Sequence, residues 1–516
     1  MNKIILFILS IISVLWMSCN DFLDVIPDNR SILDSKSKIS KILVTAYPDQ
    51  SPWLLAEFSS DNTDDNTNKW STMAAVERPA FLWKDVDDID NDSPQAVWEA
   101  CYKAIATANQ ALDAIEKIGN EDGSLNAQKG EALLARAHSH LILTNMFCKS
   151  YSSLTSVTDL GIPYMENPET TVNPQYERGT VAEVYEKINR DIEKGLPLIS
   201  ESGYAVPKYH FNKKAAYALA ARFNLYYGNY ANVIRYANLV LGTDPSSVLR
   251  DWKVLGAETN FEKRANMFIN VANPANLLLT DTYSYWPLIH GPHSVGSRYS
   301  HNQVISDNET SGSTGPWGAY TNFYLHYFSF TGGVPKYQVM KYGSDYFEYT
   351  DPVAGIGYRH MVQVDYTTDE TLLCRAEAYA LLGDYKNATQ DLVTELKAFS
   401  RVYSVDSAKI VNFYKNLNYY TPKAPTAKKR LNPDFVVKEG AQENFIQAIL
   451  HLRRIVTIHE GLRWQDVKRY GIEVYRRKVD GSFISLYDDV LRKDDPRRAL
   501  QIPKNVISAG LEPNPR

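Results

Sequence analysis

The feature that most constrains the fold is one spacing of small residues, Gly and Tyr that occurs twice. Successive members are three, four, two and three residues apart, as Ala376, Tyr379, Gly383, Tyr385 and Ala388 and again as Ala221, Asn224, Gly228, Tyr230 and Val233. Small residues let two antiparallel helices approach closely, Gly–x–Tyr makes the turn, and the Tyr ring wedges between helices. Such a hairpin cannot bury its faces alone and stacks on others. The pattern predicts a mostly α-helical, tetratricopeptide-like scaffold.

Further segments have helical periodicity. Apolar residues recur at three- and four-residue steps from Trp98 to Ile115, behind a Ser93–Pro94 start signal. Additional helices are expected over 127–147, over 181–198 behind a Thr cap, and within 443–470. In the last block, Glu460, Arg463 and Asp466 stand about one turn apart, which predicts an intrahelical ion-pair ladder. The helical scaffold is thus assigned to 53–250, with an irregular part at 53–92, and to 367–516.

The helical period fails between 251 and 366, where Gly, Pro, Ser, Thr and Asn alternate with many aromatic residues. A structureless loop of that length is improbable in a compact protein. We therefore expect a loop-rich subdomain with short strands or helices. The whole chain has 34 Tyr against 18 Phe and 9 Trp. Because Tyr combines an aromatic ring with a polar hydroxyl, it suits a solvent-exposed binding surface better than a core. This subdomain is therefore predicted to bind ligand.

The first residues predict an exported protein. A Lys at position 3 precedes an apolar run that ends at Ser18–Cys19, and the run is too short to span a bilayer, which takes about 20 residues. This pattern resembles a bacterial lipoprotein signal, in which 1–18 is removed, Cys19 is acylated and 19–52 leads into the body. Acyl chains would hold the protein on a membrane. The alternative is plain secretion, with Cys19 incidental.

Charge and motifs argue against several functions. Fifty-five Lys and Arg against 60 Asp and Glu give a net charge of -5, which disfavours nucleic acid as a partner. Asp88, Asp90, Asp92 and Glu99 have calcium-loop spacing, but Ser93 replaces the turn Gly, so an acidic helix-capping cluster is the preferred interpretation. No cofactor or metal is expected. The remaining cysteines are predicted to be buried free thiols, namely Cys101, Cys148 and Cys374.

Several motifs in fixed order make the chain similar to the SusD/RagB family of outer-membrane nutrient-binding lipoproteins of Bacteroidetes. They are Cys19–Asp24, the Trp98–Asn109 helix, Arg178–Tyr185, Lys213–Ala216, Thr368–Ala378 and His459–Asp466. The resemblance implies a surface-exposed, lipid-anchored protein with a tetratricopeptide-type scaffold and a variable ligand face. It also implies a SusC-like TonB-dependent transporter as partner, and a cargo that is most often a glycan and less often a peptide.

Sugar rings have apolar C–H faces and a rim of hydroxyls, so a sugar site needs flat aromatic platforms beside polar side chains. Candidate ligand-binding residues in the irregular regions are Trp286, Trp317, Tyr320, Tyr283, Arg298, Asn302, Trp70 and Trp83. For each ring the alternative is burial beneath the loops. Trp98, Trp252 and Trp464 are assigned to the core.

The sequence therefore predicts a binding protein that captures oligosaccharide and passes it to a transporter without catalysing a reaction. G-x-S-x-G, P-loop and dinucleotide-binding motifs are absent from the sequence. Three alternatives stay open. A peptide-capturing protein on the same scaffold would need deeper apolar pockets. A secreted glycan-cleaving enzyme would need two convergent carboxylates beside the aromatic platform. A purely structural helical adaptor would leave the exposed aromatic residues unexplained.

Overall fold

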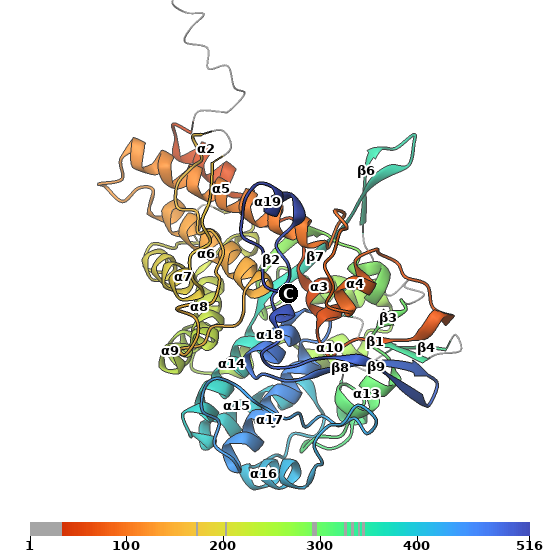
Figure 1. Ribbon diagram of the computed structural model, residues 1–516. Coiled ribbons are helices and arrows are strands. Elements are labelled where there is room, and N and C mark those ends of the chain that lie inside the picture. The colour runs from red at the N-terminus through yellow and green to blue at the C-terminus, as the bar shows by residue number, and fades with distance from the viewer. Residues whose placement is uncertain are drawn as a thin grey trace, which may run out of the picture.

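Antiparallel helical hairpins form the larger part of the molecule. The computed structural model describes residues 33–516 apart from 172–173, 202–203, 292–296, 325–327, 332–334, 339–340 and 343–345. The stacked helices are α5 (Pro94–Ile118), α6 (Asn126–Phe147), α7 (Val181–Gly195), α8 (Lys213–Tyr227), α9 (Tyr230–Leu241), α14 (Thr368–Leu381), α15 (Tyr385–Phe399) and α17 (Ala441–Val456). Figure 1 shows α5 to α9 descending one side of the molecule and α14 to α17 continuing at its base. The predicted mostly α-helical scaffold is confirmed.

The start and turn signals in the sequence act as expected. Ser93 Oγ accepts a hydrogen bond from the backbone N–H of Ala96 and caps α5, and Thr180 forms a capping box at α7. Gly228 and Gly383 adopt φ values of 81° and 83° between the paired helices, a left-handed conformation that glycine adopts without steric cost. Tyr385, which follows the turn at Gly383, stacks on Phe445 of α17 at a ring-centroid distance of 4.9 Å. The repeat spacing therefore encodes both turn and packing.

Among the described residues, short helices and three small sheets complete the fold. The other α-helices are α2 (Lys36–Leu43), α3 (Trp53–Ser59), α4 (Glu77–Phe81), α10 (Trp252–Ala257), α11 (Phe261–Phe268), α12 (Trp286–His290), α13 (Gln303–Glu309), α16 (Ser407–Asn416), α18 (Leu462–Arg469) and α19 (Lys504–Ser508). The first sheet has the strand order β2 (Asn276–Tyr283), β7 (Ile356–Thr367), β6 (Tyr346–Asp351). The second has the order β3 (Tyr299–Ser300), β1 (Asp64–Asp65), β8 (Val474–Asp480), β9 (Phe483–Leu491). The third is the pair β4 (Phe328–Thr331) and β5 (Pro335–Gln338).

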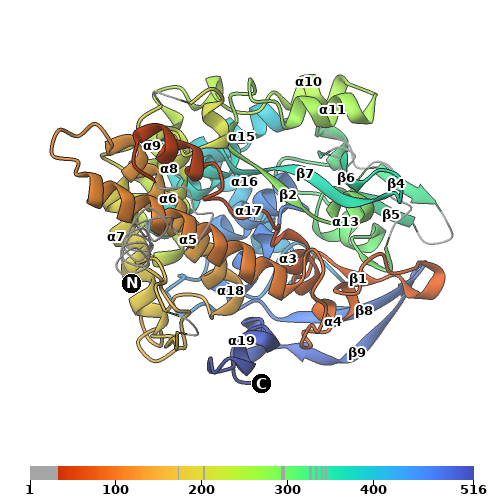
Figure 2. The ribbon, with the colours of Figure 1, turned by 90° about the horizontal axis from the view of Figure 1, so that it is seen from above.

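The region from 251 to 366 thus carries short strands and helices rather than a long open loop. Its β6–β7 hairpin stands out from the body in Figure 1. Seen from above in Figure 2, the β-rich part lies on the side away from α7 and α9. The helical scaffold therefore supports the β-rich part from one side.

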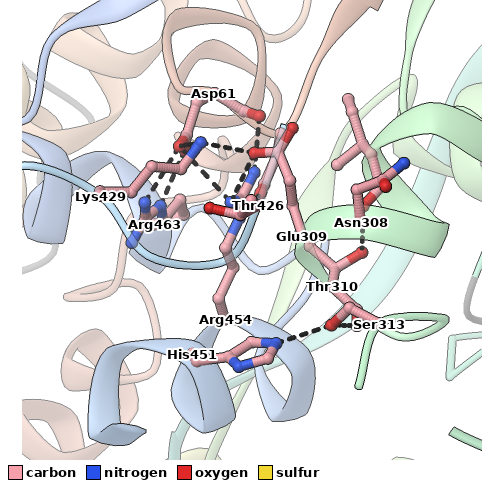
Figure 3. Close-up of polar contacts among 12 residues, drawn as sticks. Asp61, Asn308, Glu309, Thr310, Ser313, Thr426, Lys429, His451, Arg454 and Arg463 are labelled. Carbon is pink, nitrogen blue, oxygen red and sulfur yellow. Dashed lines mark hydrogen bonds and ion pairs between the residues drawn. The ribbon is translucent and has the colours of Figure 1, made fainter. Parts of the chain in front are cut away.

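A buried charge cluster joins distant parts of the chain, and we define it by Asp61, Glu309, Lys429, Arg454 and Arg463 (Figure 3). Arg463 Nε lies 2.8 Å from Asp61 Oδ1, and Glu309 Oε2 lies 2.5 Å from Lys429 Nζ and 3.1 Å from Arg454 NH1. Burial opposes ionisation of Asp61, but Arg454 and Arg463 outweigh it and hold the pKa of Asp61 well below its usual range. Each cation in the cluster therefore has a carboxylate partner.

The predicted ladder among Glu460, Arg463 and Asp466 is wrong. Glu460 accepts a hydrogen bond of 2.6 Å from Lys341 Nζ, Arg463 pairs with Asp61, and Asp466 pairs with Arg453 of α17 at 3.0 Å. All three side chains are buried. A buried charge needs a close partner, and here other elements supply it.

Cys101, Cys148 and Cys374 are buried and free, as predicted. Cys19 lies outside the described residues. Within the part of the chain that the structure describes, no helix is both long and apolar enough to cross a membrane.

Candidate functional site

Three of the four tryptophans proposed as sugar platforms are buried. The exposed fractions are 0% for Trp286, 1% for Trp317 and 3% for Trp83. Trp286 Nε1 donates to the backbone oxygen of His459 at 2.8 Å, and Trp83 Nε1 donates to that of Ser59 at 2.9 Å. The prediction that these rings form an open platform is wrong. For Trp286 and Trp83, a backbone acceptor for the ring N–H makes burial of the large apolar ring stable. The buried Trp317 Nε1 has no hydrogen-bond partner among the described residues.

The polar candidates also have structural partners. Asn302 is fully buried, donates to Asp64 Oδ2 at 3.1 Å, and caps α13. Its predicted ligand contact is therefore wrong. Arg298 is partly exposed, but its guanidinium pairs with Asp65 at 2.8 Å and links β1 to β3. Trp70 and Tyr320 are partly exposed and stay candidates.

Tyr283 belongs to a group of three rings on the β2–β7–β6 sheet. Its ring centroid lies 5.4 Å from that of Tyr358, in an edge-on arrangement, and 4.1 Å from that of His360. Tyr283 pairs with His360 across the two strands, and Tyr358 shares a face with His360 because strand side chains alternate. Tyr358 is 51% exposed. Tyr283 and Tyr358 therefore form an accessible surface, with the buried ring of His360 beside them.

Tyr209 lies beside the same strand, β2. It ends a short 3-10 helix (Pro207–Tyr209) that packs beside β2, and it is 36% exposed. Burial raises the pKa of Tyr209, and the carboxylate of Asp281, two residues before Tyr283, adds to the effect. We call Tyr209, Tyr283, Tyr358 and His360 the aromatic shelf.

Carboxylates flank the aromatic shelf. His360 Nε2 lies 2.8 Å from Glu348 Oε2 of β6, and His360 Nδ1 lies 3.3 Å from Asp281 Oδ2 of β2. The two carboxylates therefore fix the imidazole between them, and both have exposed side chains. Ring faces can contact sugar C–H groups, and carboxylates accept hydrogen bonds from hydroxyls. The shelf thus offers both kinds of contact that a saccharide needs.

Tyr283 is the one candidate from the sequence that lies on the shelf; Tyr209, Tyr358 and the two acids were missed. One signal could have found Tyr358. Ile356, Tyr358 and His360 alternate with other residues at a period of two, which is typical of one face of a strand. Tyr209 has no such signal, because it reaches the sheet from a separate loop.

The acidic residues before α5 have a role other than capping. Asp92 accepts hydrogen bonds from Ser284 Oγ at 2.7 Å and from the backbone N–H of Tyr285 at 2.6 Å, while the cap of α5 is Ser93. Burial raises the pKa of Asp92 to about 7. Asp92 therefore anchors the chain between the shelf and α12. Over the described residues, no group of three or more His, Cys, Asp or Glu side chains could hold a metal ion.

Comparisons with known proteins agree with this architecture. Residues 21–225 match the SusD-like 3 family profile, described as "Starch-binding associating with outer membrane". A SusD superfamily protein from Bacteroides thetaiotaomicron VPI-5482 is 18% identical, with 94% of this chain and 100% of that chain covered and a TM-score of 0.64. A SusD-like carbohydrate binding protein from Bacteroides vulgatus ATCC 8482 is 14% identical, with 92% of this chain and 96% of that chain covered and a TM-score of 0.63. A laminarin binding SusD-like protein is 15% identical, with 93% of this chain and 99% of that chain covered and a TM-score of 0.56. A search of curated proteins found no match.

The helical-hairpin scaffold with an attached β-rich part is the fold of SusD superfamily proteins, and residues 21–225 match a family described as starch-binding and associated with the outer membrane. The fold that it shares with the solved structures extends over nearly the whole chain. The resemblance to the SusD/RagB family that the motifs indicate is thus supported by the family match over residues 21–225 and by the shared fold.

Proposed function

We propose that this protein binds carbohydrate on the aromatic shelf and delivers it for uptake without altering it. The observation that carries the proposal is the pair of phenol rings, Tyr283 and Tyr358, held edge-on at 5.4 Å beside two exposed carboxylates. The family description as starch-binding and the printed names of the carbohydrate-binding and laminarin-binding relatives support the same ligand class.

The shelf also favours one kind of carbohydrate. Asp281 and Glu348 give its rim negative charge, and like charges on a ligand would be repelled. Hydroxyl groups, in contrast, can donate to these carboxylates. We therefore propose a neutral oligosaccharide. Because the rings lie on an open sheet face, affinity should be moderate, as suits a ligand that is handed on.

The decisive experiment is affinity electrophoresis of the chain without residues 1–19 through gels that contain starch, laminarin or no polysaccharide. Retardation by a polysaccharide is expected, and it should weaken in Tyr283→Ala and in Tyr358→Ala. Tyr349→Ala is the matched control. Tyr349 is 57% exposed on the same hairpin, but it pairs with Gly357 and so faces the other side of the sheet. Equal retardation of all variants would refute the shelf as the site.

The same preparation distinguishes the remaining alternatives. Release of shorter sugars from the polysaccharide would favour a glycan-cleaving enzyme, since Asp281 and Glu348 already lie beside the rings. Retention of peptides in place of polysaccharides would favour the peptide-capturing alternative.

Anchoring and handover complete the proposal. We place the protein on the outer membrane through acylation of Cys19, with a SusC-like TonB-dependent transporter as the partner that receives the sugar. The family's outer-membrane association supports this location. Cys19→Ala should move the protein from the membrane fraction to the soluble fraction. Firm retention in the membrane fraction would contradict lipidation, and co-purification with a transporter from membranes tests the partner.

A further inference from the structure

A cavity of about 130 Å³ lies away from the aromatic shelf, between the loop after α6, the 432–435 segment, α18 and the segment after β9. Its volume is roughly ten times the ~10–15 Å³ that one water requires. Five basic side chains and three carboxylates line it: Lys149, Lys468, Arg469, Lys493 and Arg498 with Asp434, Asp494 and Asp495. We call it the basic cavity.

Lys468 is a buried basic side chain of the basic cavity without a carboxylate partner among the described residues. The residue is 7% exposed, and its ammonium donates to the backbone oxygens of Asn145 and Cys148 at 2.8 and 2.7 Å. These bonds use two of its three N–H donors. Among the described residues, no carboxylate lies within ion-pair distance of it. Burial lowers the pKa of Lys468 to about 7, and the nearby cation of Arg498 contributes to the decrease.

Arg498 is a second buried cation of the same kind. Its guanidinium donates to the backbone oxygens of Arg492, Val467 and Ile472 at 2.7, 2.9 and 2.6 Å. In the described part of the chain it too has no carboxylate at ion-pair distance. Burial lowers its pKa to about 10, against the attraction of Asp495. Backbone oxygens satisfy its hydrogen bonds but carry no full negative charge.

The other cations of the lining are already matched. Lys149 pairs with Asp159 at 2.8 Å, Lys493 with Asp434 at 2.7 Å, and Arg469 with Glu377 at 2.9 Å. The hydroxyl oxygen of Ser150, which also lines the cavity, is buried and has no hydrogen-bond partner among the described residues. The cavity thus holds two buried basic groups, Lys468 and Arg498, without a carboxylate at ion-pair distance among the described residues, and one hydroxyl without a hydrogen-bond partner. Of its three carboxylates, Asp434 pairs with Lys493 and Asp495 with Arg497, while Asp494 attracts Arg498 from a greater distance.

We propose that the basic cavity binds a small oxyanion, of the phosphate or sulfate type, through Lys468 and Ser150. The third N–H of Lys468 and the hydroxyl of Ser150 would donate to the anion, while the ammonium groups of Lys149 and Lys493 add to the attraction. Charge-assisted hydrogen bonds of this kind are stronger than neutral ones. Arg498 acts by its charge alone, since backbone oxygens take most of its donors.

The buried charge cluster supports this assignment by contrast. There Lys429 has Glu309 at 2.5 Å and Arg463 has Asp61 at 2.8 Å, so the protein supplies its own counter-charges. An isolated buried charge is costly unless it is paired. At the basic cavity no described carboxylate pairs with Lys468, so a bound anion would supply the missing counter-charge.

The test is calorimetric titration of the wild-type protein with sodium phosphate and with sodium sulfate, at an ionic strength held constant with chloride. Saturable binding is expected for at least one anion. Lys468→Met keeps the apolar stem but removes the ammonium, and should weaken binding at least tenfold. Lys117→Met, an exposed change on α5, should bind as the wild type does. Lys493→Gln, at the edge of the cavity, should weaken binding by a smaller factor.

Two results would overturn the proposal: no saturable binding of either anion to the wild type, or equal binding to the Lys468→Met variant. Because that change removes a buried unpaired charge, it should not prevent folding, and a thermal melt checks this. A sulfated monosaccharide distinguishes the source of the anion. If the sulfated monosaccharide binds more tightly than inorganic sulfate, the ligand of the cavity is a charged sugar. If it binds more weakly, the ligand is a free anion. Tyr358→Ala should leave anion binding unchanged, so this test is independent of the shelf.

Discussion

Two sets of aromatic residues in the β-rich part of the molecule have opposite surroundings. Trp286 and Trp317 are closed inside it, whereas Tyr283 and Tyr358 form a half-open surface. Only three positions separate Tyr283 from Trp286. The aromatic content of a region therefore does not predict which of its rings are exposed. The direction of the backbone at each ring decides whether the ring faces solvent or supports the fold.

The change of direction between the two sets occurs at Ser284 and Tyr285. Strand β2 ends at Tyr283 and α12 begins at Trp286. Asp92 holds both intervening residues, through Ser284 Oγ and through the backbone N–H of Tyr285. One buried carboxylate from a distant segment thus positions the boundary between the exposed and the buried rings.

The largest expected effect comes from the buried set. Trp286→Ala should lower the free energy of unfolding by about 3–5 kcal/mol, because it removes a large buried ring and leaves a cavity. Urea unfolding followed by circular dichroism measures the loss. Tyr358→Ala is the comparison and should stay within about 0.5 kcal/mol of the wild type. Equal losses in the two variants would remove the distinction between the sets.

The second effect tests the boundary between the two sets. Asp92→Asn should cost about 1–3 kcal/mol, because an amide nitrogen cannot accept the hydrogen bond from the Tyr285 N–H. The cost should depend on pH. The pKa of Asp92 is raised from 3.8 to about 7 in the folded protein, so the stability that Asp92 contributes is full below about pH 4 and is lost as pH rises through 7. Urea unfolding of both proteins at pH 5 and pH 8 should show a larger difference at pH 5. A difference that grows toward pH 8 would contradict the protonated state.

The third effect concerns ligand binding. Tyr358→Ala should weaken polysaccharide binding by about 0.5–1.5 kcal/mol, the size of an aromatic contact beyond area burial. Titration calorimetry with the oligosaccharide selected by affinity electrophoresis measures this change. Restoration by Tyr358→Phe would show that the ring face, rather than the hydroxyl, makes the contact.

The smallest effect is expected on the opposite face of the hairpin. Tyr349→Ala should change neither the free energy of unfolding nor polysaccharide binding by more than about 0.5 kcal/mol, since its exposed ring lies outside the shelf. The same two measurements apply. A clear loss of binding would extend the site to both faces of the sheet.

Local signals made the scaffold predictable. Ser93 and Thr180 cap the expected helices, and the two Gly–x–Tyr turns adopt the left-handed conformation that their glycines permit. The exposure of the tryptophans was not predictable in this way. The backbone oxygen that accepts from Trp286 belongs to His459, 173 residues further along the chain, and Arg298 finds Asp65 at a separation of 233. Partners so distant in sequence leave no local pattern.

The buried charge cluster has a consequence for how the chain matures. Asp61 depends on Arg454 and Arg463, and Asp64 depends on Arg477. These acids are made early, yet their counter-ions arrive only when synthesis has nearly finished. Until then, the carboxylates of Asp61 and Asp64 have to stay hydrated. The amino-terminal segment therefore cannot reach its final position before the carboxyl-terminal one exists, although it leaves the ribosome first.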